Sequence, residues 1–248
     1  MITHERISTL IDLIRHGEPV GGSRYRGQMD DPLSATGWEQ MRRAVGNHHP
    51  WEVIVSSPLS RCLAFAEELS ERHGIPLEVD PRLQELGFGA WQGKTRDEIS
   101  CYDPGLLQRF YRDPMNNRPE DAEGLGDFHH RIVTAWNEIL NRHAGKHLLF
   151  VCHAGVIRMV VAYILDIPLN NLFHIKVAHA GITRIECLEQ GDEFMGQLVF
   201  HGGGALIKRN YLTADVKTIQ IDVSQIKRDV AVADKTLRSY GKYNGYKI

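Results

Sequence analysis

Long apolar runs alternate with amphipathic stretches over the first two hundred residues of the chain. The runs at residues 9–14, 51–56 and 147–152 show no alternation with polar residues, which is typical of strands buried on both faces. A short strand is expected at 77–79, and late strands are expected at 173–177, 181–188 and 197–200. The pattern therefore favours a mainly parallel sheet.

Helical periodicity fills the spaces between these strands. Helices are expected at about 37–47, 61–73, 127–143 and 156–165, and short ones at 96–101 and 105–112. Ser34 or Thr36 can cap the first helix, and Pro58 stands near the start of the second. The alternation of strands and helices predicts an α/β fold, with a mainly parallel sheet covered by helices on both faces.

The composition is that of an ordinary globular protein. The 248 residues are 42% hydrophobic and carry a net charge of −2, so no basic excess points to nucleic acid. The four cysteines form no CxxC pair, which predicts neither a metal site nor a disulfide framework and fits a cytoplasmic protein. The first residues lack the apolar core of a secretion signal, and no apolar stretch is long enough to span a membrane.

The character of the chain changes after the glycine run at 202–204. Residues 205–248 contain nine Lys/Arg and four Asp, a net charge of +5. We expect two regions: a catalytic domain at 1–204 and a basic, partly disordered extension at 205–248. A strand at 216–223 is one reading of the local alternation. The extension is interpreted as a solvated appendage, with anion or partner binding as the alternative.

Chemistry first enters at the end of the first apolar run, in the sequence Arg15-His16-Gly17-Glu18. Gly17 allows a tight turn, and ligands bind at the carboxyl ends of parallel strands. A second histidine, His153, follows the apolar run at 147–152 and is itself followed by Ala154 and Gly155. Two histidines at equivalent strand ends are expected to lie close together.

Three further segments carry groups suited to the same site. Arg61 stands in the first turn of a helix, where guanidinium and backbone N–H groups bind phosphate oxygens. Glu85 lies among apolar and glycine residues, a setting that favours a protonated carboxyl and suits a general acid. The glycine-rich loop at 15–36 supplies candidate binding groups, namely Arg24, Tyr25, Gly27 and Gln28.

Taken in order, Arg15-His16-Gly17-Glu18, residues 57–61, Glu85 and His153-Ala154-Gly155 resemble the histidine phosphatase superfamily, the phosphoglycerate-mutase-like proteins. The resemblance spans about residues 9–200. It implies a three-layer α/β/α sandwich with a mixed, mainly parallel sheet. It also implies that His16 becomes phosphohistidine and that Glu85 is the proton donor. The phosphate would be bound beside Ala154 by two guanidiniums and an imidazolium, those of Arg15, Arg61 and His153. His16 would be neutral, its second ring nitrogen held by a backbone carbonyl near Gly17.

The chain departs from the family pattern at two positions. Many members have an asparagine six residues after the nucleophile that touches phosphate; here that residue is Gly22, and Ser23 or Arg24 would replace the contact. Pro19 stands where Thr is common. Only 67 residues separate Glu85 from His153, which is similar to phosphatase members and shorter than in cofactor-dependent mutases.

The segments around Tyr25, Asp31 and Phe88 are similar to α-ribazole phosphatases of cobalamin biosynthesis. The hypothesis is a phosphomonoesterase for a small-molecule phosphate ester, with α-ribazole 5′-phosphate as one candidate. The alternatives are a phosphoglycerate mutase, another broad-specificity histidine phosphatase, or an inactive phosphate-binding scaffold. No cofactor, metal, nucleic-acid or membrane partner is expected. A homodimer is one candidate oligomeric state. Trp91 and His179 are each interpreted as structural or as bordering the pocket.

Overall fold

The computed structural model describes residues 8–47, 49–190 and 193–203, which contain one six-stranded sheet. The strands are β1 (Ser8–Arg15), β2 (Val53–Ser56), β3 (Leu77–Val79), β4 (His147–Cys152), β5 (Ile182–Gln190) and β6 (Glu193–Gly203). Their order is β3-β2-β4-β1-β5-β6, in which β3, β2, β4 and β1 are parallel. The pairs β1–β5 and β5–β6 are antiparallel, so the predicted mixed, mainly parallel sheet is confirmed.

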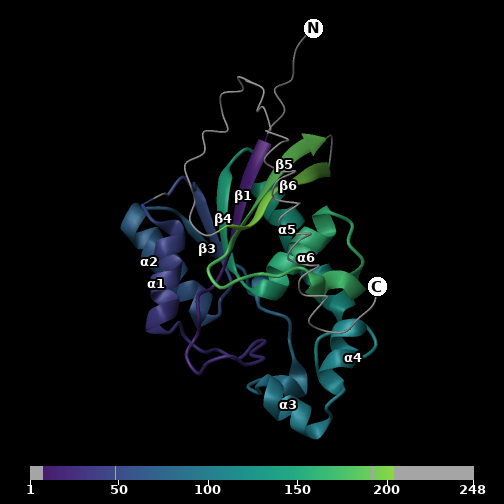
Figure 1. Ribbon diagram of the computed structural model, residues 1–248. Helices are drawn as coiled ribbons and strands as arrows, with labels where there is room; N and C mark the ends of the chain where they lie inside the picture. Colours follow the sequence, from purple (N-terminus) through teal and green to yellow (C-terminus); the bar gives the residue numbers. More distant parts are fainter. Residues whose placement is uncertain (1–7, 48, 191–192, 204–248) are drawn as a thin grey trace, which may run out of the picture. The chain divides into compact units, whose positions relative to one another are not determined.

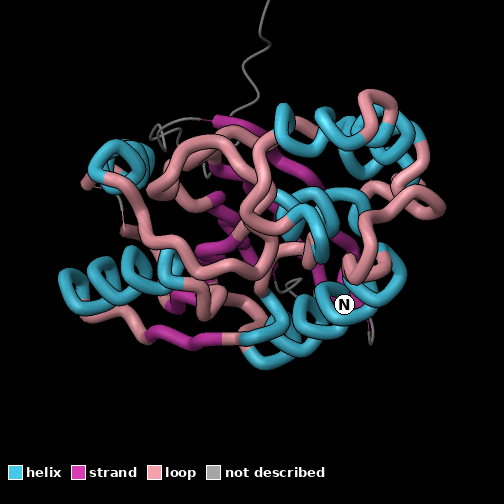
Figure 2. Tube along the Cα trace, turned by 90° about the horizontal axis from the view of Figure 1, so that it is seen from below, coloured by secondary structure: helices cyan, strands magenta, loops and turns pink. Residues whose placement is uncertain are grey.

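Helices cover both faces of this sheet, as the predicted three-layer α/β/α sandwich requires (Figure 1, Figure 2). One layer contains α1 (Ala35–Val45) and α2 (Ser60–His73), and the other contains α5 (Leu125–Arg142) and α6 (Ala154–Ile164). Alternate residues of β4 divide between the two cores: Leu148 and Phe150 pack with α5 and α6, whereas Leu149 and Val151 pack with α1 and α2. This double burial explains why the central strands are continuously apolar.

Local chemistry sets the ends of the helices. The side chain of Ser34 accepts a hydrogen bond from Gly37 N and caps α1, as one of the two predicted caps. Gly74 adopts a left-handed conformation (φ 66°) after α2. Two short helices, α3 (Arg96–Tyr102) and α4 (Leu106–Arg112), lie beyond the ends of the strands (Figure 1). A capping box of Thr95 and Glu98 opens α3.

One predicted strand is wrong. Residues 173–177 form no strand: the 3₁₀ helix η3 (Leu169–His174) covers the first two, and an extended loop follows. Arg158 donates to the carbonyl of Ile175, and Arg15 donates to the carbonyl of Val177. These carbonyls are bonded to arginine side chains instead of a neighbouring strand. The alternating apolar residues therefore pack as a loop.

The remaining helix and strand predictions differ from the structure by a few residues at their ends, except that β6 is longer than residues 197–200. The predicted extension at 205–248, with its candidate strand at 216–223, lies outside the described residues. None of the helices in the described ranges is both long and apolar enough to cross a bilayer. Cys62 and Cys152 are fully buried in the core.

A charged cluster that the pattern did not reveal lies within β1. Asp12 is fully buried, and its carboxylate accepts hydrogen bonds from Arg184 (2.7 and 2.8 Å), Trp51 Nε1 (2.8 Å) and His147 Nε2 (3.0 Å). Burial raises the pKa of Asp12, but the hydrogen bonds from Arg184 and His147 outweigh this effect and lower it. The cluster joins β1, β4 and β5 across the middle of the sheet.

Candidate active site

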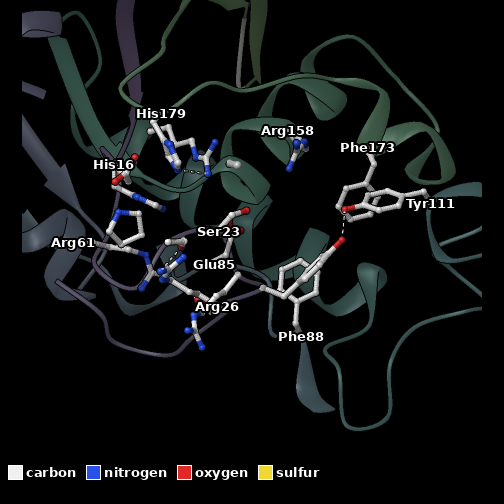
Figure 3. A pocket seen from close by; sticks show the side chains of 18 residues that line it. His16, Ser23, Arg26, Arg61, Glu85, Phe88, Tyr111, Arg158, Phe173 and His179 are labelled. Carbon is white, nitrogen blue, oxygen red and sulfur yellow. Dashed lines mark hydrogen bonds between the residues drawn. The ribbon is translucent and has the colours of Figure 1, made fainter. Parts of the chain in front are cut away.

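A cavity of about 330 Å³ opens where β1 and β4 end, among the loops that follow them. Figure 3 shows its side chains converging from several elements. The residues that line it are Arg15, His16, Glu18, Pro19, Gly22, Ser23, Arg24, Tyr25, Arg26, Gly27, Arg61, Glu85, Phe88, Tyr111, Ala154, Arg158, Phe173 and His179. Its size suits a small molecule.

His16 is held in one tautomer by the turn that follows it. Its Nδ1 donates to the carbonyl oxygen of Gly17 over 2.7 Å, as predicted, which leaves Nε2 unprotonated. Gly17 itself is required by packing, because a Cβ there would lie 2.2 Å from the carbonyl oxygen of Gly37 at the start of α1. The close approach of these two backbones fixes the turn and thereby the imidazole.

The electrostatic surroundings keep His16 neutral. Burial, followed by the positive fields of Arg15 and Arg61, holds the pKa of His16 well below its usual value of 6.5. The hydrogen bond to Gly17 opposes this shift but does not overcome it. A neutral imidazole with a free Nε2 lone pair is a nucleophile at neutral pH.

Arg15 approaches the cavity from the end of β1. It donates from Nη1 to the carbonyl of Val177 (2.8 Å) and from Nη2 to Nε2 of His179 (2.8 Å). Burial lowers the pKa of Arg15 to about 10, so it remains charged at neutral pH. Its Nε is buried with no hydrogen-bond partner among the described residues. An anion bound beside His16 would supply an acceptor for this group.

Arg61 is fixed by the loop that precedes α1. Although it lies in the first turn of α2, it is only 1% exposed, and it donates to the carbonyls of Met29 (2.6 Å) and Gly27 (2.7 Å). Its Nε, like that of Arg15, is buried without a partner in the part of the chain that the structure describes. The loop thus presents a rigid guanidinium next to His16.

His153 lies behind His16 instead of lining the cavity. It is completely buried, its ring centroid is 5.2 Å from that of His16 in an edge-on arrangement, and its Nε2 lies 2.8 Å from Ser57 Oγ. The expected imidazolium is not what this environment favours: burial, then the fields of Arg61 and His16, hold the pKa of His153 well below 6.5. In the free protein His153 is therefore a neutral neighbour of His16.

Glu85 is oriented by the start of α6. The backbone N–H of Gly155 donates to both of its carboxylate oxygens (3.0 and 3.1 Å), and Leu86 N–H donates to Oε1 (2.9 Å). A Cβ at position 155 would lie 2.2 Å from Glu85 Oε1, so any larger side chain there would displace the carboxylate. The glycine after His153-Ala154 is thus what lets the carboxylate approach the helix end.

The loop after β1 contributes a second wall. Three of the four predicted binding residues of this loop line the cavity, namely Arg24, Tyr25 and Gly27. Gln28 does not line it; its side-chain Nε2 donates to the backbone carbonyl of Glu85 over 3.4 Å. Arg24 is exposed, with its guanidinium bonded to the carbonyls of Gly21 and Gly93.

Gly22 lines the cavity with φ 72°, and its carbonyl accepts from the buried Arg26 (2.7 Å). Arg26 also pairs with Asp31, and this ties down the loop at the position of the missing asparagine.

Sequence reasoning missed several lining residues. Arg158 lies one helical turn after Ala154 on α6, and this i, i+4 spacing was the available signal. Phe88, Tyr111 and Phe173 gave no signal, because they come together only through the tertiary structure. Of the two residues with alternative readings, His179 borders the cavity, and Trp91 is buried among Tyr25 and Phe110.

Within residues 8–47, 49–190 and 193–203, no group of three or more His, Cys, Asp or Glu side chains is arranged to hold a metal ion. The positive charge of the cavity comes instead from arginines, whose N–H groups can bind phosphate oxygens directly.

Comparison with known proteins places these features in a family. Residues 11–197 match the sequence profile of the histidine phosphatase superfamily (branch 1). A glucosyl-3-phosphoglycerate phosphatase of Mycolicibacterium vanbaalenii is 32% identical over 178 residues, which cover 67% of this chain and 78% of that protein. An adenosylcobalamin/alpha-ribazole phosphatase of Salmonella typhimurium is 26% identical over 181 residues, covering 71% and 90% of the two chains.

Comparison of the fold with solved structures also finds phosphatases of this kind. The native structure of a mycobacterial glucosyl-3-phosphoglycerate phosphatase superposes with a TM-score of 0.71 at 28% identity, covering 79% of this chain and 99% of that one. Probable phosphoglycerate mutases also occur among the relatives. The relatives therefore include both hydrolases and mutases.

Proposed function

Because the chain belongs to the histidine phosphatase superfamily, branch 1, we propose that it hydrolyses small-molecule phosphate monoesters through a phosphohistidine at His16. One observation carries the proposal: a neutral His16, with Nδ1 bound to Gly17 O and Nε2 left as the nucleophilic nitrogen, lies beside the guanidiniums of Arg15 and Arg61 and shares the cavity with the carboxyl group of Glu85. Nucleophile, charge stabilisation and proton donor are thereby present in one cavity.

In the first step, His16 Nε2 attacks the phosphorus atom and the bond from phosphorus to the ester oxygen breaks. Arg15 and Arg61 stabilise the negative charge on the phosphoryl oxygens with fixed N–H donors. Glu85, in its protonated form, transfers its proton to the departing oxygen. The products of this step are an alcohol, a phosphohistidine and a Glu85 carboxylate.

In the second step, water attacks the phosphohistidine. The Glu85 carboxylate accepts a proton from this water, the bond between phosphorus and nitrogen breaks, and inorganic phosphate leaves. The hydrogen bonds from Gly155 and Leu86 hold the carboxylate in place for both steps. His153 packs edge-on against His16 and acts by positioning its ring.

We propose hydrolysis instead of phosphoryl transfer between substrates because the segment between Glu85 and His153 is short. Its 67 residues include α3, α4 and α5. They contain no long insertion that would shield the phosphohistidine from water. Two relatives suggest substrates for a test panel. One is named as an α-ribazole phosphatase, which would place this chain in cobalamin biosynthesis, and the other as a glucosyl-3-phosphoglycerate phosphatase.

The test is phosphate release from p-nitrophenyl phosphate and from a panel of metabolite phosphates, with and without a chelator. We expect the wild type to release phosphate at a rate that the chelator leaves unchanged, since Arg15 and Arg61 supply the charge. His16→Ala should lose about 10⁴-fold or more of kcat, because the remaining groups act only together with the nucleophile.

A matched control is His130→Ala, which removes an exposed histidine of α5. Its rate should equal that of the wild type. An inactive wild type across the whole panel would instead support the phosphate-binding scaffold, and a fully active His16→Ala would exclude His16 as the nucleophile. If the wild type instead interconverted phosphoglycerate isomers in a reaction that requires 2,3-bisphosphoglycerate, without hydrolysing them, the protein would be a mutase.

A further inference from the structure

Arg158 is a cavity arginine for which the proposed hydrolysis has no use. It projects from α6 one turn after Ala154, and it lines the same cavity as His16. Figure 3 shows it between His16 and the aromatic side chains of Tyr111 and Phe173. The reacting phosphoryl group already has Arg15 and Arg61, whose fields act directly on His16. Arg158 therefore faces a different part of a bound ester, the leaving group.

Arg158 has no ion-pair partner among the residues that the structure describes. Its Nε donates to the carbonyl of Ile175 (2.8 Å), which orients the guanidinium, but no carboxylate of the described residues lies within 4 Å to form an ion pair with it. Burial lowers the pKa of Arg158, and the field of Glu85 opposes this effect. A partly buried cation without a counterion is costly, unless a ligand supplies the negative charge.

The surroundings of Arg158 describe the rest of the ligand. Tyr25, Phe88, Tyr111 and Phe173, here called the aromatic wall, line the cavity on this side. The guanidinium carbon of Arg158 lies 5.5 Å from the ring centre of Phe173, and the hydroxyls of Tyr25 and Tyr111 are joined by a 2.6 Å hydrogen bond. The wall offers apolar surface to a carbon skeleton and leaves Arg158 as its cationic group.

We propose that Arg158 binds a carboxylate carried by the leaving group of the substrate, so that the preferred esters are phosphorylated hydroxy acids. A single guanidinium matches one carboxylate in charge and in its paired N–H geometry, whereas the phosphoryl group at His16 is matched by two. This assignment rests on the proposed hydrolysis, because it takes the ester phosphate to be bound at His16.

The test compares near-isosteric esters that differ in this charge. The substrates are 3- and 4-carboxyphenyl phosphate and the corresponding carbamoylphenyl phosphates. For at least one ring position, the wild type should show kcat/KM about tenfold or more higher for the carboxylate, which is the effect of one charge-assisted hydrogen-bonded pair. Arg158→Met should bring this ratio close to one.

Two companion variants localise the effect. Arg43→Met, which removes an exposed arginine of α1, should retain the full preference. Arg96→Met tests the smaller neighbouring hollow lined by Arg24 and Arg96, and it should retain the preference as well. Should Arg158→Met fail to fold, Arg158→Lys serves in its place: it keeps the charge but loses the paired geometry, and it should keep only part of the preference.

The outcomes separate this proposal from the one on which it rests. His16-dependent hydrolysis of all four esters without a carboxylate preference would overturn the role of Arg158 and leave the phosphatase intact. Loss of the preference in Arg96→Met instead of Arg158→Met would also overturn it. If Arg158 acted only on Glu85, Arg158→Met would change kcat/KM for the carboxylate and carbamoyl esters by the same factor and leave the preference intact; the expected result is that the preference is lost. No hydrolysis of any ester by the wild type would refute the phosphatase itself.

Discussion

At the scale of single residues, the position of Glu85 depends on the absence of a side chain at residue 155. A Cβ there would lie 2.2 Å from Glu85 Oε1, so Gly155→Ala must displace the carboxylate that the backbone N–H now holds. Since general acid–base catalysis contributes roughly 10²–10⁴-fold, we expect kcat to fall by about 10²-fold or more. Steady-state kinetics with p-nitrophenyl phosphate provide the measurement.

The control for this substitution is Gly126→Ala. Gly126 and Gly155 are both the second residue of a helix, but a Cβ at 126 meets no atom within 4 Å. The control should keep its activity and gain up to about 1 kcal/mol of stability, because alanine restricts the unfolded chain. Equal activity of the two variants would show that Glu85 does not need its present position.

Three residues of the site could be predicted from sequence because each stands at the end of an apolar run or at the start of a helix. Arg15, His16 and Arg61 all line the cavity as expected. For Arg158 the sequence offered only its i, i+4 spacing from Ala154, because it stands in the middle of an apolar helix and its hydrogen bond to the η3 loop shows which way it faces. The neutral state of His153 was also hidden, because it results from complete burial next to Arg61.

At the scale of elements, the three strands β1, β4 and β5 depend on the buried carboxylate of Asp12. Asp12→Asn keeps the size of the side chain but removes the negative charge that Arg184 and His147 contact. Because removal of one partner of a buried pair leaves the other charge uncompensated, we expect the free energy of unfolding to fall by about 3 kcal/mol or more. Urea unfolding followed by circular dichroism measures this change.

A matched exposed pair serves for comparison. Glu39 and Arg43 are an i, i+4 pair on α1 with both side chains largely exposed, so Glu39→Gln should change stability by no more than about 0.5 kcal/mol. If Asp12→Asn were as mild as this control, the cluster would be dispensable for holding the three strands together.

Most elements could be predicted because their apolar periodicity matches the burial that the layers impose. Residues 173–177 show where this reasoning fails. Their alternation is typical of a strand, yet both sides of β1 are already paired with β4 and β5, and the carbonyls of Ile175 and Val177 are bonded to arginines from α6 and β1. Long-range partners of this kind leave no local pattern.

At the scale of the whole molecule, two buried neutral histidines make folding stability depend on pH. The folded-state pKa values of His16 and His153 are both depressed, chiefly by burial, so below pH 6.5 the unfolded chain binds protons that the folded protein does not. Stability therefore falls as the pH decreases through the unfolded value of 6.5, until the depressed folded pKa is reached. Each histidine contributes up to about 1.4 kcal/mol per pH unit in this window.

Chemical unfolding at several pH values between 7 and 5.5, in a buffer free of phosphate, tests this dependence. Burial also lowers the pKa of His179, to about 4, so the informative quantity is the difference between variants. His16→Gln should unfold with a visibly smaller loss of stability on acidification than the wild type, whereas His130→Gln should keep the wild-type slope. Identical slopes for all three proteins would mean that His16 takes up a proton as readily in the folded protein as in the unfolded chain. The loss of stability below neutral pH would then not come from His16. The assignment of a neutral His16, on which the proposed nucleophilic attack depends, would be wrong.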